Sequence, residues 1–423
     1  MTTQASAVLR APALDLVSAA MSTRERPLDF ALILHMDDAP PVDALRSGAR
    51  SARRSFPTSG CLLRGGVWTS VAVPLDGGVA TAGLAEATDA VERFVNAPFD
   101  PHRELPIRQL AIYPLSGTKL ILVSRFHHAL CDGVGAAMWL AHQLDVAWGS
   151  TKPAKNCRAA LPAPLLRAHR SPVRRSRYAY KRPSDALYTA RSQASPRRRW
   201  HSFELDASRL KAITRSGCEF SYSDLLATCF LEAIIAWNRA CHPGGGRQIG
   251  LWYPLNIRQD PFAGFGNGTS RIRIYPRYDD RSSLADKCRA VREQVAWCKR
   301  HGEWAVPETH PLILLLRLSR WTSALAAPLL RAFLNRPGVD MGTAVFTHAE
   351  RSALTSCAWV GSIERIESVG MLHERYPLGL TGVTIRDKSW LTLTFDPARF
   401  ERRDVSVFLD RFHEQLRMAR DLR

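Results

Sequence analysis

The spacing of apolar residues in the first third of the chain predicts strands and helices in alternation. Residues 28–37 (LDFALILHMD), 105–113 (LPIRQLAIY) and 119–126 (KLILVSRF) are short runs of β-branched, aromatic and other apolar residues, and they predict strands. Residues 42–54 and 134–148 predict helices, the second because its apolar side chains recur at the period of a helix with one buried face. Strands and helices in mixed order are typical of an α/β or α+β protein.

The second half of the chain repeats this mixture. Strands are predicted over residues 200–205 and 249–255, and helices over residues 222–240, 284–300 and 405–422. The predicted apolar face of the last helix comprises Val407, Phe408, Phe412, Leu416 and Ala419. Between the halves, residues 150–200 are rich in Pro, Arg and Ser and have little periodicity, which indicates a crossover linker.

Residues 127–133 (HHALCDG) form the densest chemical motif of the chain, between a predicted strand and a predicted helix. A neutral histidine titrates near neutral pH and can take a proton from a hydroxyl, amine or thiol. Asp132 and Gly133 stand at the expected helix start, where the helix dipole stabilises a carboxylate. We therefore interpret Asp132 as an organiser of the loop, while a backbone N–H near Gly133 could face a developing oxyanion.

Two other interpretations of the histidine pair compete with catalysis. Adjacent histidines after a strand can be buried and hydrogen bonded, or they can bind a metal ion. A metal site needs a third and a fourth ligand, and no other cluster of His or Cys in the sequence has suitable spacing. We therefore expect no metal ion and no bound cofactor.

The full string HHALCDG resembles the HHxxxDG motif of the chloramphenicol acetyltransferase-like superfamily. Residues 94–114 are similar to the segment before that motif, residues 253–276 to a strand, loop and Gly-Asn element, and residues 376–400 to a late hairpin. The superfamily includes peptide-synthetase condensation domains, polyketide-associated acyltransferases, wax ester synthases and plant BAHD acyltransferases. The DFGWG element of the plant enzymes is absent, and the opening motif of peptide-synthetase condensation domains is not visible. A freestanding bacterial-type member fits better.

The resemblance implies a role for each residue of the motif. His128, the second histidine, would be the general base, and His127 would be a supporting neighbour. Asp132 would hold the loop through a charge pair, and Gly133 would keep space at the substrate channel. Cys131 occupies a position that varies in the family, and we interpret it as a small buried side chain.

Two residues outside the motif are further candidates by the same resemblance. Arg258, in the LNIR stretch, would be the partner of Asp132. Asn267, in GFGNG, would contact the channel or the transition state. An asparagine between glycines is equally typical of a turn, so both interpretations of Asn267 stay open.

The resemblance also implies a fold and a reaction. Two lobes, each a mixed sheet flanked by helices, would meet in a V around a central tunnel. Residues 1–165 would form the N-terminal lobe, residues 166–199 a basic crossover linker, and residues 200–423 the C-terminal lobe. The reaction would move an acyl group from a thioester, on coenzyme A or on an acyl carrier protein, to a small-molecule alcohol or amine. We expect a monomer that acts in natural-product or lipid biosynthesis.

The charge of the chain adds candidate partners. There are 58 basic and 39 acidic residues, which give a net charge of +19. Fifty of the basic residues are arginine. A GC-rich coding sequence explains this excess of arginine as well as a functional basic surface does. Residues 167–199 hold eleven Arg and Lys residues against one Asp. Such a surface could attract an acidic carrier protein, the phosphates of coenzyme A, an anionic membrane or nucleic acid. Nucleic acid is disfavoured because no zinc finger, recognition helix or RNA-binding signature accompanies the charge.

Cysteine usage and apolar runs bear on location. Nine cysteines without a CxxC spacing indicate reduced thiols and a cytoplasmic protein. No run of about 18 apolar residues occurs, so no transmembrane span is predicted. Residues 311–334 are the most apolar long segment, although Arg317, Arg320 and Arg331 interrupt it and Pro328 breaks it. They predict a pair of core helices, with a wall of an acyl tunnel or a peripheral membrane contact as alternatives.

Acyl transfer is the leading functional hypothesis, and two others compete with it. A non-catalytic module of the same fold that recruits a carrier protein would be expected to lack the second histidine, which this chain keeps as His128. A basic nucleic-acid-binding protein agrees with the charge but with no motif. Salt-dependent retention on DNA would identify that third class.

Overall fold

The structure is a computed structural model that describes most of the chain. The described residues are 8–72, 79–83, 87–113, 119–150, 178, 184–189, 191, 193–215, 219–242, 248–258, 264–276, 279–301, 311–318, 320–334, 336, 339, 342–350 and 357–420. The predicted basic linker, residues 166–199, lies largely outside the described residues, and only its later part is discussed below.

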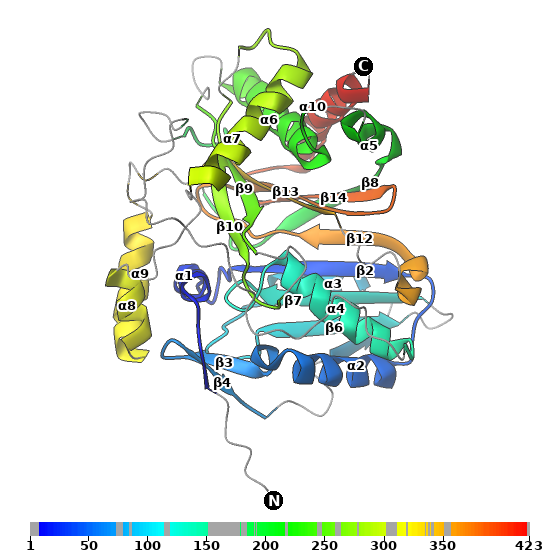
Figure 1. The fold of residues 1–423 in the computed structure, drawn as a ribbon, viewed down its shortest axis with the longest axis vertical. Helices are drawn as coiled ribbons and strands as arrows, with labels where there is room; N and C mark the ends of the chain where they lie inside the picture. Colours follow the sequence, from blue (N-terminus) through cyan, green and yellow to red (C-terminus); the bar gives the residue numbers. More distant parts are fainter. Residues whose placement is uncertain are drawn as a thin grey trace, which may run out of the picture.

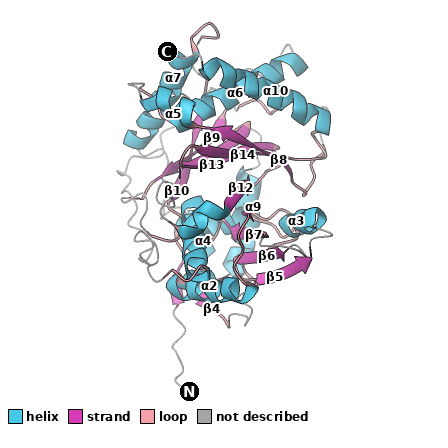
Figure 2. Ribbon diagram, turned by 90° about the vertical axis from the view of Figure 1, so that its right-hand side faces the viewer, coloured by secondary structure: helices cyan, strands magenta, loops and turns pink. Residues whose placement is uncertain are grey.

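The first lobe is built on a five-stranded sheet with the order β12-β2-β7-β6-β5. Its strands are β2 (Asp29–Met36), β5 (Val79–Gly83), β6 (Ile107–Tyr113), β7 (Leu120–His127) and β12 (Ile363–Val369). This lobe is the lower one in Figure 1. Helices α2 (Val42–Ser55) and α4 (Gly133–Ala147) cover one face of its sheet, and α3 (Ala87–Asn96) covers the other, as Figure 2 shows. A small sheet with the order β1-β4-β3 completes this lobe. Its strand β1 (Val8–Arg10) precedes α1 (Ala13–Met21), and β3 (Cys61–Arg64) and β4 (Val67–Ser70) follow η1 (Pro57–Gly60).

The second lobe is built on a six-stranded sheet with the order β10-β9-β11-β13-β14-β8. Its strands are β8 (Arg199–Asp206), β9 (Leu251–Asn256), β10 (Thr269–Ile274), β11 (Ala344–Glu350), β13 (Leu378–Ile385) and β14 (Lys388–Phe395). Helices α5 (Ser208–Arg215), α6 (Tyr222–Cys241), α7 (Leu284–His301) and α10 (Arg402–Arg420) cover its outer face, as Figure 2 shows from the side. The predicted architecture of two lobes, each a mixed sheet flanked by helices, is therefore confirmed.

Strand β12 joins the two lobes, because it comes late in the chain and yet pairs with β2 of the first sheet. The amides of Ser368 and Gly370, at its end, donate to the hydroxyls of Thr392 and Thr394 on β14, each at 3.0 Å. The lobe boundaries at residues 165 and 200 remain a prediction. The structure shows in addition that β12, from the second half of the sequence, belongs to the sheet of the first lobe. The hydrophobic core of the first lobe, here called the first core, thus includes residues from both halves of the sequence.

The helices predicted from apolar spacing are present, but two faces differ from the prediction. In α10, Val405, Phe408 and Phe412 are buried, whereas Val407 is 38% exposed. Val407 was wrongly placed on the apolar face because the buried stripe follows the helical period through Val405 instead. Residues 311–334 form two helices, α8 (Pro311–Leu318) and α9 (Arg320–Leu334), beside α1 at the edge of the molecule (Figure 1). They are not simply core helices, because much of their apolar surface is exposed.

Candidate active site

The HHALCDG motif forms the turn between β7 and α4. Strand β7 ends at His127, and α4 begins at Gly133 with Asp132 as its N-cap. The Asp132 side chain accepts hydrogen bonds from the amides of Val134 and Gly135, both at 3.0 Å. These amides have no partner within the helix, so the carboxylate satisfies them and is stabilised by the helix dipole. The strand-to-helix placement and the N-cap predicted from sequence are both confirmed.

Arg258 is the charge partner of Asp132, as predicted. Its two terminal nitrogens lie 2.8 and 2.9 Å from the two oxygens of the Asp132 carboxylate, and both side chains are at least 95% buried. The Gly268 amide adds a third backbone hydrogen bond, at 2.9 Å from Oδ2. Burial raises the pKa of Asp132, but the charge and hydrogen bonds of Arg258 outweigh it and lower the pKa to about 2. Asp132 is therefore a fixed carboxylate that ties α4 to the loop before β10.

His127 is fully buried and bonds both the motif and the end of α1. Its Nδ1 accepts from the Ala129 amide at 3.0 Å, so the neutral ring carries its proton on Nε2 and donates to the Ser22 hydroxyl, also at 3.0 Å. Burial lowers the pKa of His127 to about 3, although the charge of Asp29 opposes this. His127 is therefore held by two hydrogen bonds in the interior, and its supporting role in the reaction stays a prediction.

His128 is the motif's partly exposed histidine. Its amide donates to the Leu28 carbonyl at 2.9 Å, and its ring lies 4.7 Å from the ring of Phe30. Burial and then the charge of Arg271 lower the pKa of His128 to about 3, although Asp132 and a hydrogen bond to the Cys131 backbone oppose this. A histidine whose pKa is lowered is neutral at physiological pH, so one of its ring nitrogens keeps a lone pair. His128 is thus a neutral imidazole that can accept a proton.

An apolar cavity of about 130 Å³ opens beside His128, between the two lobes. Its lining comes from β2, β11, β12, β13, α4 and the 3₁₀ helix η4 (Ala358–Ser362), and includes Leu32, Leu34, Ala137, Leu140, Val345, Trp359, Ile363, Ile366, Val383 and Ile385. Gly133 also lines it, and its role in keeping space at a substrate channel stays a prediction. The arrangement places one proton acceptor against a largely hydrocarbon surface.

Asn267 holds the backbone of the motif. Its Nδ2 donates to the His128 carbonyl at 2.6 Å and to Asp15 Oδ1 at 2.8 Å. Asp15 is itself anchored by Trp68 Nε1, at 3.0 Å from Oδ2. These contacts support a positioning role for Asn267 at the turn, and a contact with a transition state stays a prediction.

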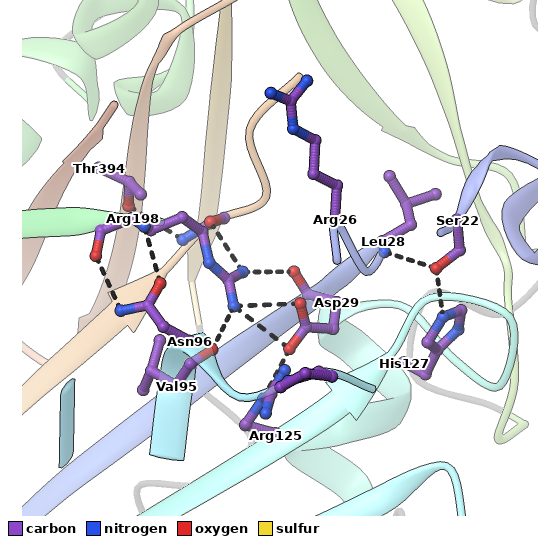
Figure 3. A network of polar contacts seen from close by, with 12 residues as sticks. Ser22, Arg26, Leu28, Asp29, Val95, Asn96, Arg125, His127, Arg198 and Thr394 are labelled. Carbon is purple, nitrogen blue, oxygen red and sulfur yellow. Dashed lines mark hydrogen bonds and ion pairs between the residues drawn. The ribbon is translucent and has the colours of Figure 1, made fainter. Parts of the chain in front are cut away.

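A buried charge cluster that the sequence analysis missed lies next to the motif (Figure 3). Asp29, on β2, is fully buried between Arg125, whose Nε lies 2.7 Å from Oδ2, and Arg198, whose NH2 lies 3.1 Å from Oδ1. Burial raises the pKa of Asp29, but the charges of Arg198 and Arg125 outweigh it and lower the pKa. Asp29 faces His127 in the pairing of β2 with β7, so the cluster borders the histidine pair.

Arg198 also overturns an expectation about the basic linker. Residues 197–199 were expected to contribute to an exposed basic surface, but the side chain of Arg198 is only 7% exposed. Its guanidinium donates to the Val95 carbonyl at 2.7 Å and to the Asp29 carbonyl at 2.9 Å. Arg198 immediately precedes β8 of the second lobe, so these bonds fasten that lobe to β2 and α3 of the first. A charged residue inside the apolar run 28–37 was the one sequence signal of this cluster.

A larger cavity, of about 730 Å³, lies on the other face of the first sheet. Its lining includes Ile33 and His35, which alternate along β2 with Leu32 and Leu34 of the apolar cavity. None of the predicted site residues lines it. Within the described ranges, no three His, Cys, Asp or Glu side chains are grouped to hold a metal ion, and no helix there is both long and apolar enough to cross a membrane.

Comparison with known proteins identifies the fold. No family model matches the chain, and no curated protein matches it by sequence. A variant of the starter condensation domain of rhizomide synthetase RzmA, in complex with C8-CoA and Leu-SNAC, matches with a TM-score of 0.69 and 12% identity over 99% of this chain and 95% of that chain. The first condensation domain of the calcium-dependent antibiotic synthetase, in complex with a substrate analogue, matches with a TM-score of 0.68 and 14% identity over 99% of this chain and 97% of that chain. TRI3 trichothecene 15-O-acetyltransferase from Fusarium sporotrichioides matches with a TM-score of 0.66 and 13% identity over 99% of this chain and 96% of that chain.

These matches span both lobes, so the whole described architecture is shared. At such low identity the likeness establishes the fold alone. The chain has the fold of condensation domains and related acyltransferases, which agrees with the resemblance drawn from HHALCDG.

Proposed function

We propose that this protein is an acyltransferase in which His128 is the general base and a thioester is the acyl donor. The observation that carries the proposal is the position of His128, a neutral and partly exposed imidazole at an apolar cavity between the lobes. A proton acceptor next to a hydrocarbon surface is suited to activating a hydroxyl or amine that attacks an acyl group. It is less suited to binding a metal ion or a phosphate group.

The proposed reaction needs no covalent intermediate with the protein. The acceptor O–H or N–H gives its proton to His128 as its oxygen or nitrogen attacks the thioester carbonyl carbon. The carbonyl carbon becomes tetrahedral, and its oxygen becomes an oxyanion that nearby hydrogen-bond donors or positive charge would stabilise. The C–S bond then breaks, the carbonyl re-forms, and the proton passes from His128 to the leaving thiolate. Holding both substrates at one histidine is itself a large part of the rate enhancement.

The fold neighbours support a thioester donor. The RzmA domain was solved with C8-CoA and Leu-SNAC, and TRI3 is an O-acetyltransferase by name. For this chain we propose an acyl thioester of coenzyme A or of an acyl carrier protein, with an alcohol or an amine as acceptor. The apolar lining of the cavity favours a hydrocarbon acyl chain over a polar one.

A donor panel tests this function. The protein is incubated with acyl-CoA and acyl-carrier thioesters of increasing chain length, with and without candidate alcohols and amines, and free thiol is measured. We expect acceptor-dependent thiol release that His128→Ala removes. If no donor releases thiol above the uncatalysed rate with any acceptor, while a carrier protein still binds, the chain is a non-catalytic recruiting module instead.

The pH profile of kcat/KM follows from the pKa of His128. Because burial lowers that pKa to about 3, the imidazole is already neutral throughout the physiological range. We therefore expect kcat/KM with an alcohol acceptor to be flat between roughly pH 5 and 8 and to fall only in stronger acid. A histidine with the ordinary pKa of about 6.5 would instead lose activity as the pH falls through that value. A midpoint near pH 6.5, assigned to His128, would contradict a base that is neutral throughout the physiological range.

The cavity also predicts how donor selectivity changes when its space is reduced. Ala137 lines the cavity on α4, and Ala137→Leu extends a side chain into it. We expect kcat/KM for donors with long acyl chains to fall about 10–200-fold relative to the acetyl donor. This is the typical change in discrimination when a pocket differs by about one methylene group. Ala147→Leu, at the end of the same helix and outside the cavity lining, is the matched control. An unchanged ratio in Ala137→Leu would show that the acyl chain lies elsewhere.

A further inference from the structure

The outer face of helix α9 is apolar. Leu325, Leu329 and Phe333 follow one another at intervals of four residues and are 71%, 60% and 47% exposed. Pro328 and Ala332, between them, are also exposed. On the neighbouring α8, Leu314 and Leu315 are 45% and 38% exposed. Five of the eight large apolar side chains that the structure describes as exposed therefore belong to this helix pair.

The inner face of α9 explains why the apolar side chains face outward. Ala326 and Leu330 pack into the first core. Arg331 also points inward, and its NH1 donates to the carbonyls of Ala20 and Ser22, at 2.7 and 3.3 Å, where α1 ends. A cation at a helix C-terminus satisfies free carbonyls and suits the helix dipole. The arginine is thus directed to the protein while the leucines are left outside, the reverse of an ordinary surface helix.

The charged residues of the segment that forms this face have one sign. Residues 309–339 include four arginines and no Asp or Glu. Arg336 is exposed just after α9, with its guanidinium 5.7 Å from the centre of the Phe333 ring. The chain as a whole carries a net charge of +19. The face therefore combines exposed leucine and phenylalanine with arginine at its margin, and its segment has no acidic residue. This combination matches a binding partner that is apolar inside and negatively charged at its surface.

We propose that the outer face of α8 and α9 (Leu314, Leu315, Leu325, Leu329 and Phe333, with Arg336 at its margin) binds the interface of an anionic lipid bilayer. Neither helix is long enough to cross a membrane, so the contact is with one leaflet. The helices stand at the edge of the molecule in Figure 1, away from α10 at the other end. A projecting face dominated by leucine suits lipid better than a protein partner, since leucine is under-represented among the residues that dominate protein interfaces.

The membrane face is connected to the candidate active site through α1. Arg331 binds the backbone at Ala20 and Ser22, and the Ser22 hydroxyl bonds His127. The proposed lipid contact would therefore hold the protein with α1 and the histidine motif near the bilayer. An acceptor or product dissolved in the membrane would then be concentrated near the site. The lipid contact itself does not depend on the proposed reaction.

Vesicle flotation of the full-length protein tests the contact. Vesicles of phosphatidylcholine alone are compared with vesicles that also contain phosphatidylglycerol, at low and at high salt. We expect the protein to float with the anionic vesicles at low salt. The triple variant Leu325→Ser, Leu329→Ser, Phe333→Ser is expected to lower the partition coefficient at least about tenfold, because three apolar side chains no longer enter the interface.

Two further variants separate the contributions. Val407→Ser with Met418→Ser removes exposed apolar side chains from α10 and is expected to leave flotation unchanged. Arg336→Glu is expected to reduce the preference for anionic vesicles. Circular dichroism melting verifies that each variant is folded.

Several outcomes would overturn the proposal. A wild-type protein that does not float with anionic vesicles contradicts it, and so does a folded triple variant that floats like the wild type. A dimer in gel filtration that the triple variant dissolves, without any vesicle binding, would assign the face to a second copy of the chain.

Discussion

Replacing His128 with alanine is expected to lower kcat by about 10²–10⁴-fold while the protein stays folded, the range that general-base catalysis typically contributes. The reason is local. The His128 side chain is partly exposed at the cavity, and its backbone bonds to Leu28 and Asn267 do not depend on the ring. Steady-state kinetics with a thioester donor measures the loss, and the melting temperature verifies the fold.

A matched histidine separates a catalytic effect from a structural one. His142 lies on α4, bonds the hydroxyl of Ser51 at 3.0 Å, and lines no part of the apolar cavity. His142→Ala is expected to reduce stability without a selective loss of kcat. If His128→Ala retains kcat within about threefold of the wild type, another group is the base and the proposed function loses its main support.

Local features of the site were predictable from sequence, because they depend on neighbours along the chain. Two apolar runs, a break and a helical period placed the motif on a strand-to-helix turn, and Asp132 was predicted as the cap from its position alone. Each of these interactions spans only a few residues. The spacing of apolar side chains therefore contained enough information to predict them.

Long-range partners were not predictable in the same way. Asp132 and Arg258 are 126 residues apart, and only the family resemblance suggested the pair. Arg125 and Arg198 were not singled out as partners of Asp29, because with fifty arginines in the chain nothing in the sequence marks the two that surround it. A charge within an apolar strand, as at Asp29, was informative, since a buried charge needs a partner, but it did not identify that partner.

Which face of a helix turns inward was also beyond the sequence pattern. The apolar residues of 311–334 predicted helices that bury them, yet Leu325 and Leu329 face solvent. The inner face of α9 is held by tertiary contacts, because Arg331 donates to a carbonyl at the end of α1 while Ala326 and Leu330 pack into the core of the first lobe. Periodicity shows that a helix has two faces, and the partner that each face meets comes from another part of the chain.

Breaking the pair of Asp132 and Arg258 is expected to destabilise the protein by about 3–5 kcal/mol, the usual cost of leaving one member of a buried ion pair alone. Arg258→Met leaves the Asp132 carboxylate without its cation, although three backbone amides still bond it. Asp132→Ala leaves Arg258 buried and those amides without an acceptor. Denaturant unfolding of both variants measures the loss. Asp43→Ala, which removes an exposed pair with Arg46, is the control and should change stability by less than about 1 kcal/mol.

The double variant and pH test the same pair by a second route. Asp132→Ala combined with Arg258→Met removes both charges, so it should be less unstable than the sum of the single variants. The pKa of Asp132 is about 2 in the folded protein against 3.8 for the free side chain. A lowered carboxyl pKa stabilises the fold above the unfolded value, and this contribution is lost as pH falls toward the folded value. The stability gap between wild type and the double variant should therefore narrow between about pH 5 and pH 2. If the single variants unfold like the wild type and only their rates fall, Asp132 acts in the chemistry and does not hold the loop.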